Sequence, residues 1–216
     1  MFILIRHGES VANVANDNSD GKATDLTPLG LEQALALKPI LAKYFAIDFV
    51  FSSPALRCIK TAAACTDVPA AVLDDIYELS NGVIDGVKTE DIAKIPTVGK
   101  EIAAIMEMDK DITKLDMIFD KQTIANYKRV EQLCKAEGDY PARLARAVRL
   151  AKSYTDRGKN VLFVTHAGVL SAIVCHMFDM HRLANVSVPN CSISVIDMKK
   201  KQLLLNRYDA IKAAKK

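Results

Sequence analysis

Short apolar runs alternate with longer stretches of mixed polarity along most of this chain. The apolar runs have the length of strands and lie at residues 2–5, 48–51, 70–73 and 160–165. Runs that are apolar at nearly every position are typical of strands buried on both faces of a sheet. Between them, apolar residues recur at helical spacing, so strands and helices alternate. This order predicts an α/β fold, a three-layer sandwich with a mostly parallel sheet flanked by helices.

The helices are predicted from their caps and from their apolar spacing. Thr27 is a suitable N-cap and Pro28 fits a first helical turn, so a core-facing helix is expected to begin there. Further helices are expected at about residues 54–65, 140–154 and 169–178. His176 lies in the last of these, which is almost entirely apolar, and we expect it to be packed in the core. Residues 192–197 and 202–207 predict an antiparallel hairpin across a lysine-rich turn.

Residues 82–137 differ from the rest of the chain. They contain short amphipathic stretches without a clear strand pattern, and Ile102, Ile105 and Met106 share one helical face. We expect this segment to be a helical cap inserted into one α/β domain that spans residues 1–216. In the helix predicted after the cap, we expect Arg143 to be mostly solvated.

Composition and charge limit the classes of partner. Half of the 216 residues are hydrophobic and the net charge is +3, which is too mild to predict nucleic-acid binding. No apolar run is long enough to span a membrane, and the chain starts directly with a strand instead of a signal sequence. The five cysteines include no C-x-x-C pair, so neither a disulfide framework nor a zinc site is expected. We therefore expect a cytoplasmic protein with no metal and no cofactor, and a homodimer is compatible with the sequence.

Basic residues follow three of the predicted strands at the point where each strand ends. Arg6 and His7 follow the first strand, Arg57 follows the second after a Ser-Ser-Pro turn, and His166 follows the fourth. The carboxyl ends of parallel strands lie at one edge of a sheet, and ligands of open α/β folds bind outside that edge. We therefore expect these basic side chains to converge in one site.

Such a cluster suits a tetrahedral phosphate dianion. Arginine forms paired, charge-assisted hydrogen bonds with phosphate oxygens. A neutral imidazole can act as a nucleophile near pH 7 when its other ring nitrogen is protonated and held, for instance by a backbone carbonyl. Since neither metal-ligand spacing nor a glycine-rich phosphate loop occurs, side chains alone must neutralise the anion. The expected partner is a small phosphorylated substrate, with no nucleic acid and no membrane.

Five short motifs occur in order along both halves of the chain. They are Arg6-His7-Gly8-Glu9-Ser10, Leu26-Thr27-x-x-Gly30-x-x-Gln33-Ala34, Ser52-Ser53-Pro54-x-x-Arg57-x-x-x-Thr61-Ala62, Glu78 with Gly82 and Gly86, and Val164-Thr165-His166-Ala167-Gly168. Together they resemble the signatures of the histidine phosphatase superfamily, also called the phosphoglycerate mutase-like family. The Arg-His-Gly triplet is a weak signal alone, whereas the ordered set is highly specific.

The resemblance implies a role for each residue of the expected site. His7 would be the nucleophile that forms a phosphohistidine, and Glu78 would protonate the leaving oxygen and then assist the attack of water. The residues that would bind the transferring phosphoryl group are Arg6, Arg57, His166 and, by similarity to the mutase branch, Asn13. Positioning and electrostatics would supply most of the acceleration, as is usual in phosphoryl transfer.

Departures from the mutase branch of that family favour hydrolysis. The mutase branch has an Arg-x-Tyr-Gly arrangement after its glutamate and an arginine pair in its cap, whereas Glu78 precedes Leu-Ser-Asn-Gly and residues 83–127 contain no arginine. A mutase needs extra cationic contacts to hold its intermediate for a second transfer. We therefore expect a metal-independent phosphomonoester hydrolase that acts through a phosphohistidine. The alternatives are cofactor-dependent mutase-type phosphoryl transfer and a non-catalytic protein of the same fold that binds a phospho-ligand.

Overall fold

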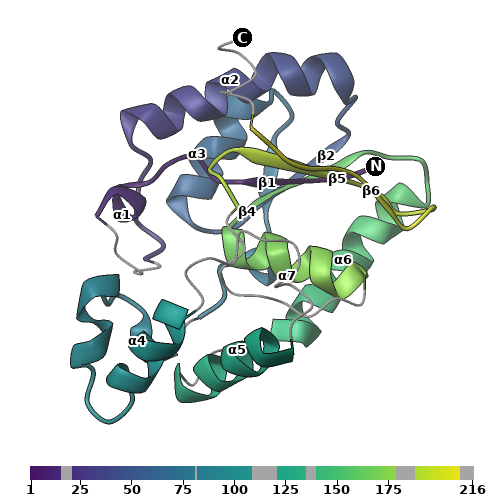
Figure 1. Cartoon of the computed structure of the whole chain (residues 1–216). Helices are drawn as coiled ribbons and strands as arrows, with labels where there is room; N and C mark the ends of the chain where they lie inside the picture. Colours follow the sequence, from purple (N-terminus) through teal and green to yellow (C-terminus); the bar gives the residue numbers. More distant parts are fainter. Residues whose placement is uncertain (16–20, 81, 109–120, 135–139, 179–187, 210–216) are drawn as a thin grey trace.

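A computed structural model describes residues 1–15, 21–80, 82–108, 121–134, 140–178 and 188–209 of the chain. Within these residues, a six-stranded sheet has the order β3-β2-β4-β1-β5-β6 (Figure 1). The strands are β1 (Phe2–Arg6), β2 (Phe49–Ser52), β3 (Ala70–Val72), β4 (Val161–Thr165), β5 (Ser192–Asp197) and β6 (Gln202–Asp209). The first four are parallel, and β5 and β6 add an antiparallel hairpin beside β1. The α/β sandwich expected from the sequence is confirmed.

Helices cover both faces of the sheet and make the outer layers. One face is covered by α2 (Pro28–Tyr44) and α3 (Leu56–Cys65), and the other by α6 (Tyr140–Thr155) and α7 (Ala167–Met177). A short α1 (Val11–Val14) and the 3-10 turn η1 (Asp74–Ile76) lie in the connections. None of the described helices is both long and apolar enough to cross a membrane.

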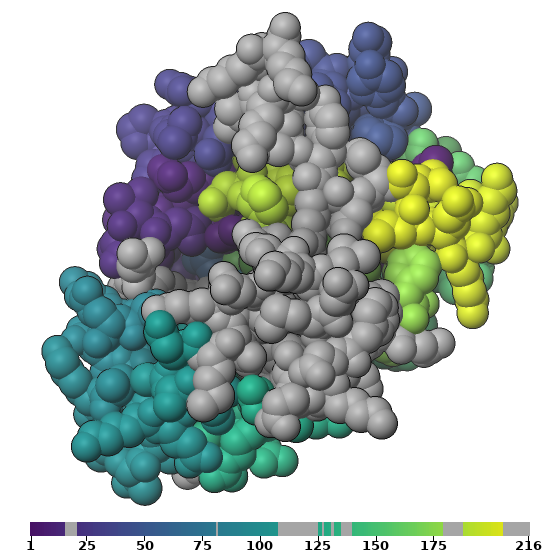
Figure 2. Space-filling model, viewed as in Figure 1, coloured from purple at the N-terminus to yellow at the C-terminus, as the bar shows by residue number. Residues whose placement is uncertain are grey.

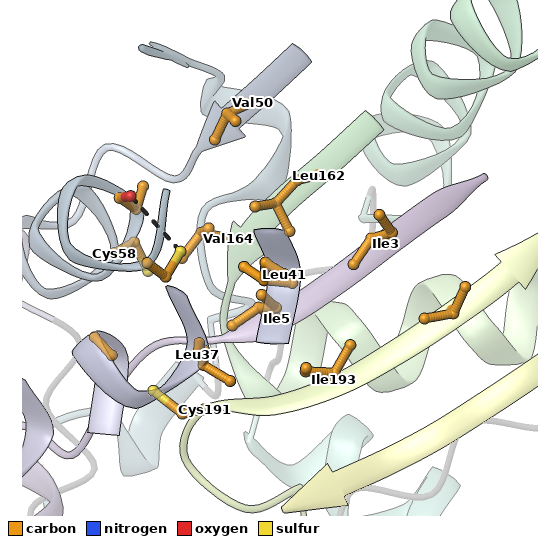
Figure 3. Packing of buried hydrophobic residues seen from close by; sticks show 14 of the residues in the cluster. Ile3, Ile5, Leu37, Leu41, Val50, Cys58, Leu162, Val164, Cys191 and Ile193 are labelled. Carbon is orange, nitrogen blue, oxygen red and sulfur yellow. Dashed lines mark hydrogen bonds between the residues drawn. The ribbon is translucent and has the colours of Figure 1, made fainter. Parts of the chain in front are cut away.

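The alternation of side chains along β1 explains why its apolar run is continuous. Ile3 and Ile5 point to the face where Leu37 and Leu41 of α2 pack (Figure 3), while Phe2 and Leu4 belong to the cluster on the other face. All of these side chains are at most 1% exposed. A central strand with helices on both sides has no face that tolerates polar residues, so the strand is apolar throughout until its carboxyl end.

The start of α7 and the burial of its histidine differ from what the sequence predicts. The helix begins at Ala167, immediately after His166, and not at residue 169. His176 is exposed, so the prediction that it is packed in the core is wrong. The buried positions of α7 lie between Val169 and Ile173, and the last turn of the helix leaves its histidine on the surface. Apolar neighbours in sequence therefore did not indicate burial at this position.

The described part of residues 82–137 is helical. It contains η2 (Gly82–Ile84), η3 (Thr89–Lys94), α4 (Gly99–Met108) and α5 (Lys121–Cys134), and no strand is found in its described residues. Ile92, Ile102 and Cys134 form a small apolar cluster separate from the two clusters on the sheet. The teal residues of this segment occupy one end of the molecule (Figures 1 and 2). That the segment is a cap inserted into a single domain stays a prediction.

Candidate active site

The sheet order brings the basic strand ends together. Because β4 lies between β2 and β1, His166 at its end has the end of β1 on one side and the end of β2 on the other. The rings of His7 and His166 have centroids 5.3 Å apart. Arg57, in the first turn of α3, contacts both rings. The structure thus gathers His7, Arg57 and His166 at one edge of the sheet, as the topology predicts.

His7 is held as a neutral imidazole whose Nε2 lone pair faces Arg57. Its Nδ1 lies 2.7 Å from the carbonyl oxygen of Gly8 and donates to it, while its Nε2 accepts from Nε of Arg57 at 3.3 Å. A guanidinium nitrogen can only donate, so these partners assign the tautomer. Burial, with the charges of Arg6 and Arg57, lowers the pKa of His7 well below 6.5. The imidazole is therefore neutral at pH 7, and its Nε2 can act as a nucleophile.

His166 is also neutral and has the opposite tautomer. Nη2 of Arg57 donates to its Nδ1 at 3.0 Å, so its Nε2 carries the proton and donates to Oγ of Ser53 at 2.7 Å. Burial, followed by the neighbouring His7 and Arg57, lowers the pKa of His166 well below 6.5. Sγ of Cys58 lies 3.5 Å from the same Nε2. A closely packed ring of this kind has one fixed orientation.

Arg6 supplies a buried donor without a partner. Its Nη1 donates to the carbonyl oxygen of Val188, whereas its Nε is buried and has no hydrogen-bond partner among the described residues. Burial lowers the pKa of Arg6, in part offset by Glu78. An unpaired buried donor is costly, and an anion that accepted from it would remove this cost. Arg6 therefore leaves one buried donor at this edge of the sheet that an anion would satisfy.

Asn13 lies close to this edge through the first turn after β1. Ser10 caps α1, and Oδ1 of Asn13 accepts from the Ser10 amide at 3.1 Å. The same oxygen accepts from Nδ2 of Asn190 at 3.1 Å, and Asn190 also donates to the carbonyl oxygen of His7 at 3.0 Å. Both acceptor bonds fix the amide of Asn13 so that its NH2 group, not its oxygen, is available to an anion.

Two of the sequence motifs act by holding the loop that carries His7. The amide of Gly8 donates to Oγ1 of Thr61 at 3.0 Å, and the amide of Glu9 donates to Oε1 of Gln33 at 2.8 Å. Thr27 caps α2 and donates to Oε1 of Glu9 at 2.8 Å. These bonds tie the loop to α2 and α3, and therefore restrict the backbone on which the His7 side chain depends.

Glu78 lies at the N-terminus of α7. Its carboxylate accepts from the amides of Gly168 at 3.3 Å and Val169 at 3.2 Å, and from its neighbour Leu79 at 2.9 Å. The amide groups of a first helical turn are natural partners for a carboxylate. Glu78 also lines a pocket of about 550 Å³, whose other lining residues are Gly21, Lys22, Asp74, Tyr77, Ser80, Asp85 and Arg143. This pocket places Glu78 where a leaving group could be bound.

Three residues of the site do not appear among those expected from the sequence. Ser53 belongs to the Ser-Ser-Pro turn and could have been recognised from that motif, whereas Asn190 precedes β5 in a stretch without any signature. Arg143 is half-buried and donates to the carbonyl oxygens of Asp75 and Tyr77, so the prediction that it is mostly solvated is wrong. Its periodic position on α6 resembled that of the exposed arginines on the same helix.

No metal site accompanies these residues in the described part of the chain. There, no group of three or more His, Cys, Asp or Glu side chains is arranged to hold a metal ion. The positive charge of the site comes from guanidinium groups.

Comparison with known proteins identifies the family. A model of the histidine phosphatase superfamily (branch 1) matches residues 2–210. This chain belongs to the histidine phosphatase superfamily. Members of this superfamily are phosphatases or mutases.

Relatives of this histidine phosphatase superfamily member include both kinds of enzyme. A broad-specificity phosphatase of Saccharomyces cerevisiae is 26% identical, with 95% of this chain and 84% of the relative covered. A 2,3-bisphosphoglycerate-dependent phosphoglycerate mutase of Streptococcus agalactiae is 26% identical, with 96% and 97% covered. The solved alpha-ribazole phosphatase of Shigella flexneri is 25% identical and has a TM-score of 0.69, with 96% and 95% covered. The superfamily is established, and the reaction has to be argued from the site.

Proposed function

We propose that this chain is a metal-independent phosphomonoester hydrolase that acts through a phosphohistidine at His7. The observation that carries the proposal is the state of His7, a buried neutral imidazole with Nε2 beside Arg57 and its other nitrogen bound to a carbonyl oxygen. Nearby, Nε of Arg6 is a buried donor without a partner among the described residues. A nucleophile surrounded by phosphate-binding donors suits a phosphoryl group better than any uncharged substrate.

In the first half of the reaction, Nε2 of His7 attacks phosphorus and the bond to the leaving oxygen breaks. Arg6, Arg57 and Asn13 donate hydrogen bonds to the transferring oxygens, which requires Arg57 to exchange its bonds to the imidazoles for bonds to the phosphate. This exchange frees Nδ1 of His166, which donates to the phosphate after it takes up a proton. Glu78 takes up the proton that a monoanionic phosphate ester brings to the site and delivers it to the leaving oxygen, so the product leaves as a neutral alcohol. The pocket beside Glu78 holds the leaving group.

In the second half, water replaces the leaving group in the pocket. Its oxygen attacks phosphorus, the bond from phosphorus to Nε2 breaks, and the carboxylate of Glu78 accepts the proton of the water. Inorganic phosphate then dissociates and His7 returns to its neutral state. Positive charge and preorganised donors stabilise the transferring group in both halves, without a metal ion.

The proposal is tested by comparing wild type with His7→Ala on phenyl phosphate, in the presence and absence of a chelator. We expect hydrolysis by wild type with and without the chelator, and a loss of at least about a thousandfold in the variant because the nucleophile is gone. A phosphoenzyme that is labile in acid and stable in base should be trapped with wild type alone. His176→Ala, which removes an exposed histidine of α7, is the matched control.

Two results would replace this proposal by another. Interconversion of 2- and 3-phosphoglycerate, at a rate above hydrolysis, would make the chain a mutase, in agreement with its mutase relatives. Binding of phosphate esters with no turnover between about pH 5 and pH 8 would leave a non-catalytic ligand-binding protein. Loss of turnover on chelation would contradict the metal-independent mechanism.

A further inference from the structure

Three consecutive carbonyl groups just before Glu78 are held by side chains from other elements. The carbonyl oxygens of Asp75 and Tyr77 accept from Nη1 of Arg143 at 3.0 and 2.6 Å. The carbonyl oxygen of Ile76, between them, accepts from Oγ1 of Thr165 at 2.7 Å. This set of contacts, which we call the carbonyl clamp, fixes a segment that has no regular strand or α-helix of its own.

The clamp joins two layers of the molecule around the segment. Arg143 lies on α6 and is half-buried, while Thr165 is the last residue of β4 and is fully buried. Ile76 is fully buried in the cluster under α6 and α7. The side chain of Arg146, one turn further along α6, pairs with the carboxylate of Asp75 at 2.8 Å. Arg143 and Arg146 thus lie on one helix and contact one segment in different ways.

The position of Glu78 depends on this segment. A general acid must come within hydrogen-bond reach of the atom that it protonates, so a shift of one ångström is costly. At the other end, the Glu78 carboxylate contacts the amides that begin α7. Its backbone, however, follows directly on Tyr77, whose carbonyl oxygen is closer to Nη1 of Arg143 than that of Asp75. Release of that carbonyl would let the acid move relative to the imidazoles.

We propose that Arg143 is a positioning residue for Glu78, which acts by holding the carbonyl oxygens of Asp75 and Tyr77. This inference rests on the proposed hydrolase function, and specifically on Glu78 as the group that protonates the leaving oxygen. Arg143 also lines the pocket of the leaving group, so a direct contact with substrate is the competing explanation of any effect on activity. The two explanations differ in how the effect depends on the basicity of the leaving oxygen.

The experiment compares phenyl phosphate with 4-nitrophenyl phosphate in wild type and Arg143→Gln. The two esters are similar in shape, but the nitrophenolate is the better leaving group and needs little protonation. The ratio kcat/KM includes every step up to departure of the leaving group and excludes hydrolysis of the phosphoenzyme. We expect kcat/KM of the variant to fall by about tenfold or more for phenyl phosphate and by less than about threefold for 4-nitrophenyl phosphate, because only the first depends on a well-placed acid.

Two further variants make the test independent of a folding defect. Arg149→Gln removes a charge from an exposed position on the same helix and is the matched control. We expect it to leave kcat/KM unchanged for both esters. Thr165→Val removes the middle contact of the clamp with little change in volume, and should show the same dependence on the leaving group. Thr165→Val decides the matter if Arg143→Gln does not fold.

An equal loss of kcat/KM for both esters in Arg143→Gln and Thr165→Val would overturn the inference. A structural role or a contact with substrate lowers kcat/KM for both esters alike. That outcome would leave the proposed function intact as long as wild type hydrolyses both esters and forms the phosphoenzyme. Absence of turnover in wild type would instead refute the hydrolase itself. The failures of the two proposals are therefore distinguishable.

Discussion

At the scale of single residues, the site is dominated by two imidazoles that are kept neutral. Burial, together with the charges that surround them, lowers the pKa of both His7 and His166 well below 6.5. The donors of Arg57 are directed at the lone pairs of these rings, so neutrality and tautomer are set by the same contacts. The protein thereby retains a nucleophilic nitrogen at a pH where a solvated histidine would be partly protonated.

This neutrality predicts a dependence of stability on pH. As pH falls below 6.5, histidines of the unfolded chain bind protons while the buried rings do not, so the free energy of unfolding decreases. Each ring should contribute a loss of at most about 1.4 kcal/mol per pH unit until its folded pKa is reached. We expect His7→Gln and His166→Gln to unfold in urea with a weaker dependence on pH between about 7.5 and 5.5 than wild type.

The comparison needs a control for the loss of any histidine. His176→Gln changes an exposed histidine of α7 and serves that purpose. If the two buried variants kept the full pH dependence of wild type, their rings would not be held neutral in the folded protein.

At the scale of elements, the start of α2 is built into the loop that carries His7. A Cβ atom on Gly30 would lie 2.0 Å from the carbonyl oxygen of Glu9, and one on Gly8 would lie 2.3 Å from the carbonyl oxygen of Gly30. The backbones of the loop and the helix are therefore in direct contact. With the Gln33 and Thr27 contacts to Glu9, this approach explains why the second motif contains these residue types.

The variant Gly30→Ala distinguishes two effects on the free energy of unfolding, the gain from helix propensity and the loss from a clash with the loop backbone. Alanine in place of glycine within a helix normally adds about 0.5–1 kcal/mol of stability. Here the new Cβ would collide with backbone, so we expect a loss of about 1–3 kcal/mol in urea unfolding together with a lower kcat/KM. Leu31→Ala alters an exposed neighbour on the same helix as a control. A stabilised and fully active Gly30→Ala protein would contradict the close approach.

At the scale of the whole molecule, the sheet core and the described helices of residues 82–134 are separate apolar clusters. Cys58, Cys65 and Cys191 belong to a cluster on the sheet, whereas Cys134 belongs to the small cluster with Ile92 and Ile102. Burial raises the pKa of Cys65 to about 12, so its thiol is inert as well as inaccessible. Regions with few buried apolar contacts open with less free energy than the core.

The cysteines of the folded protein should react with a thiol reagent in an order set by their burial and by the cluster in which they lie. We expect Cys175, which is half-buried, to react first at about pH 8, Cys134 next through local opening, and the three sheet cysteines only upon global unfolding. Mass spectrometry of labelled peptides over time gives the order, and Cys175→Ser should lack the first phase. Reaction of Cys134 together with the sheet cysteines would show that the helical segment does not open independently of the sheet.

Most of the fold could be predicted from local patterns. Buried strands and amphipathic helices leave periodic traces, and the rule that parallel strands share an edge was enough to place His7, Arg57 and His166 together. The same reasoning failed for His176 and Arg143, because periodicity describes one helix and not what lies against it. The roles assigned to the six site residues stay predictions for the experiments above.

Residue type and order along the chain were thus sufficient for the α/β class, for the edge of the sheet where the basic side chains meet, and for the chemistry that two arginines and two histidines favour there. The partners of those groups were decided by packing between distant segments. Ser53 and His166 are 113 residues apart, Asn190 and His7 are 183 apart, and Arg143 reaches Tyr77 across 66. Such contacts follow from which surfaces meet in three dimensions, and hydrogen bonds of this kind leave no period in the sequence.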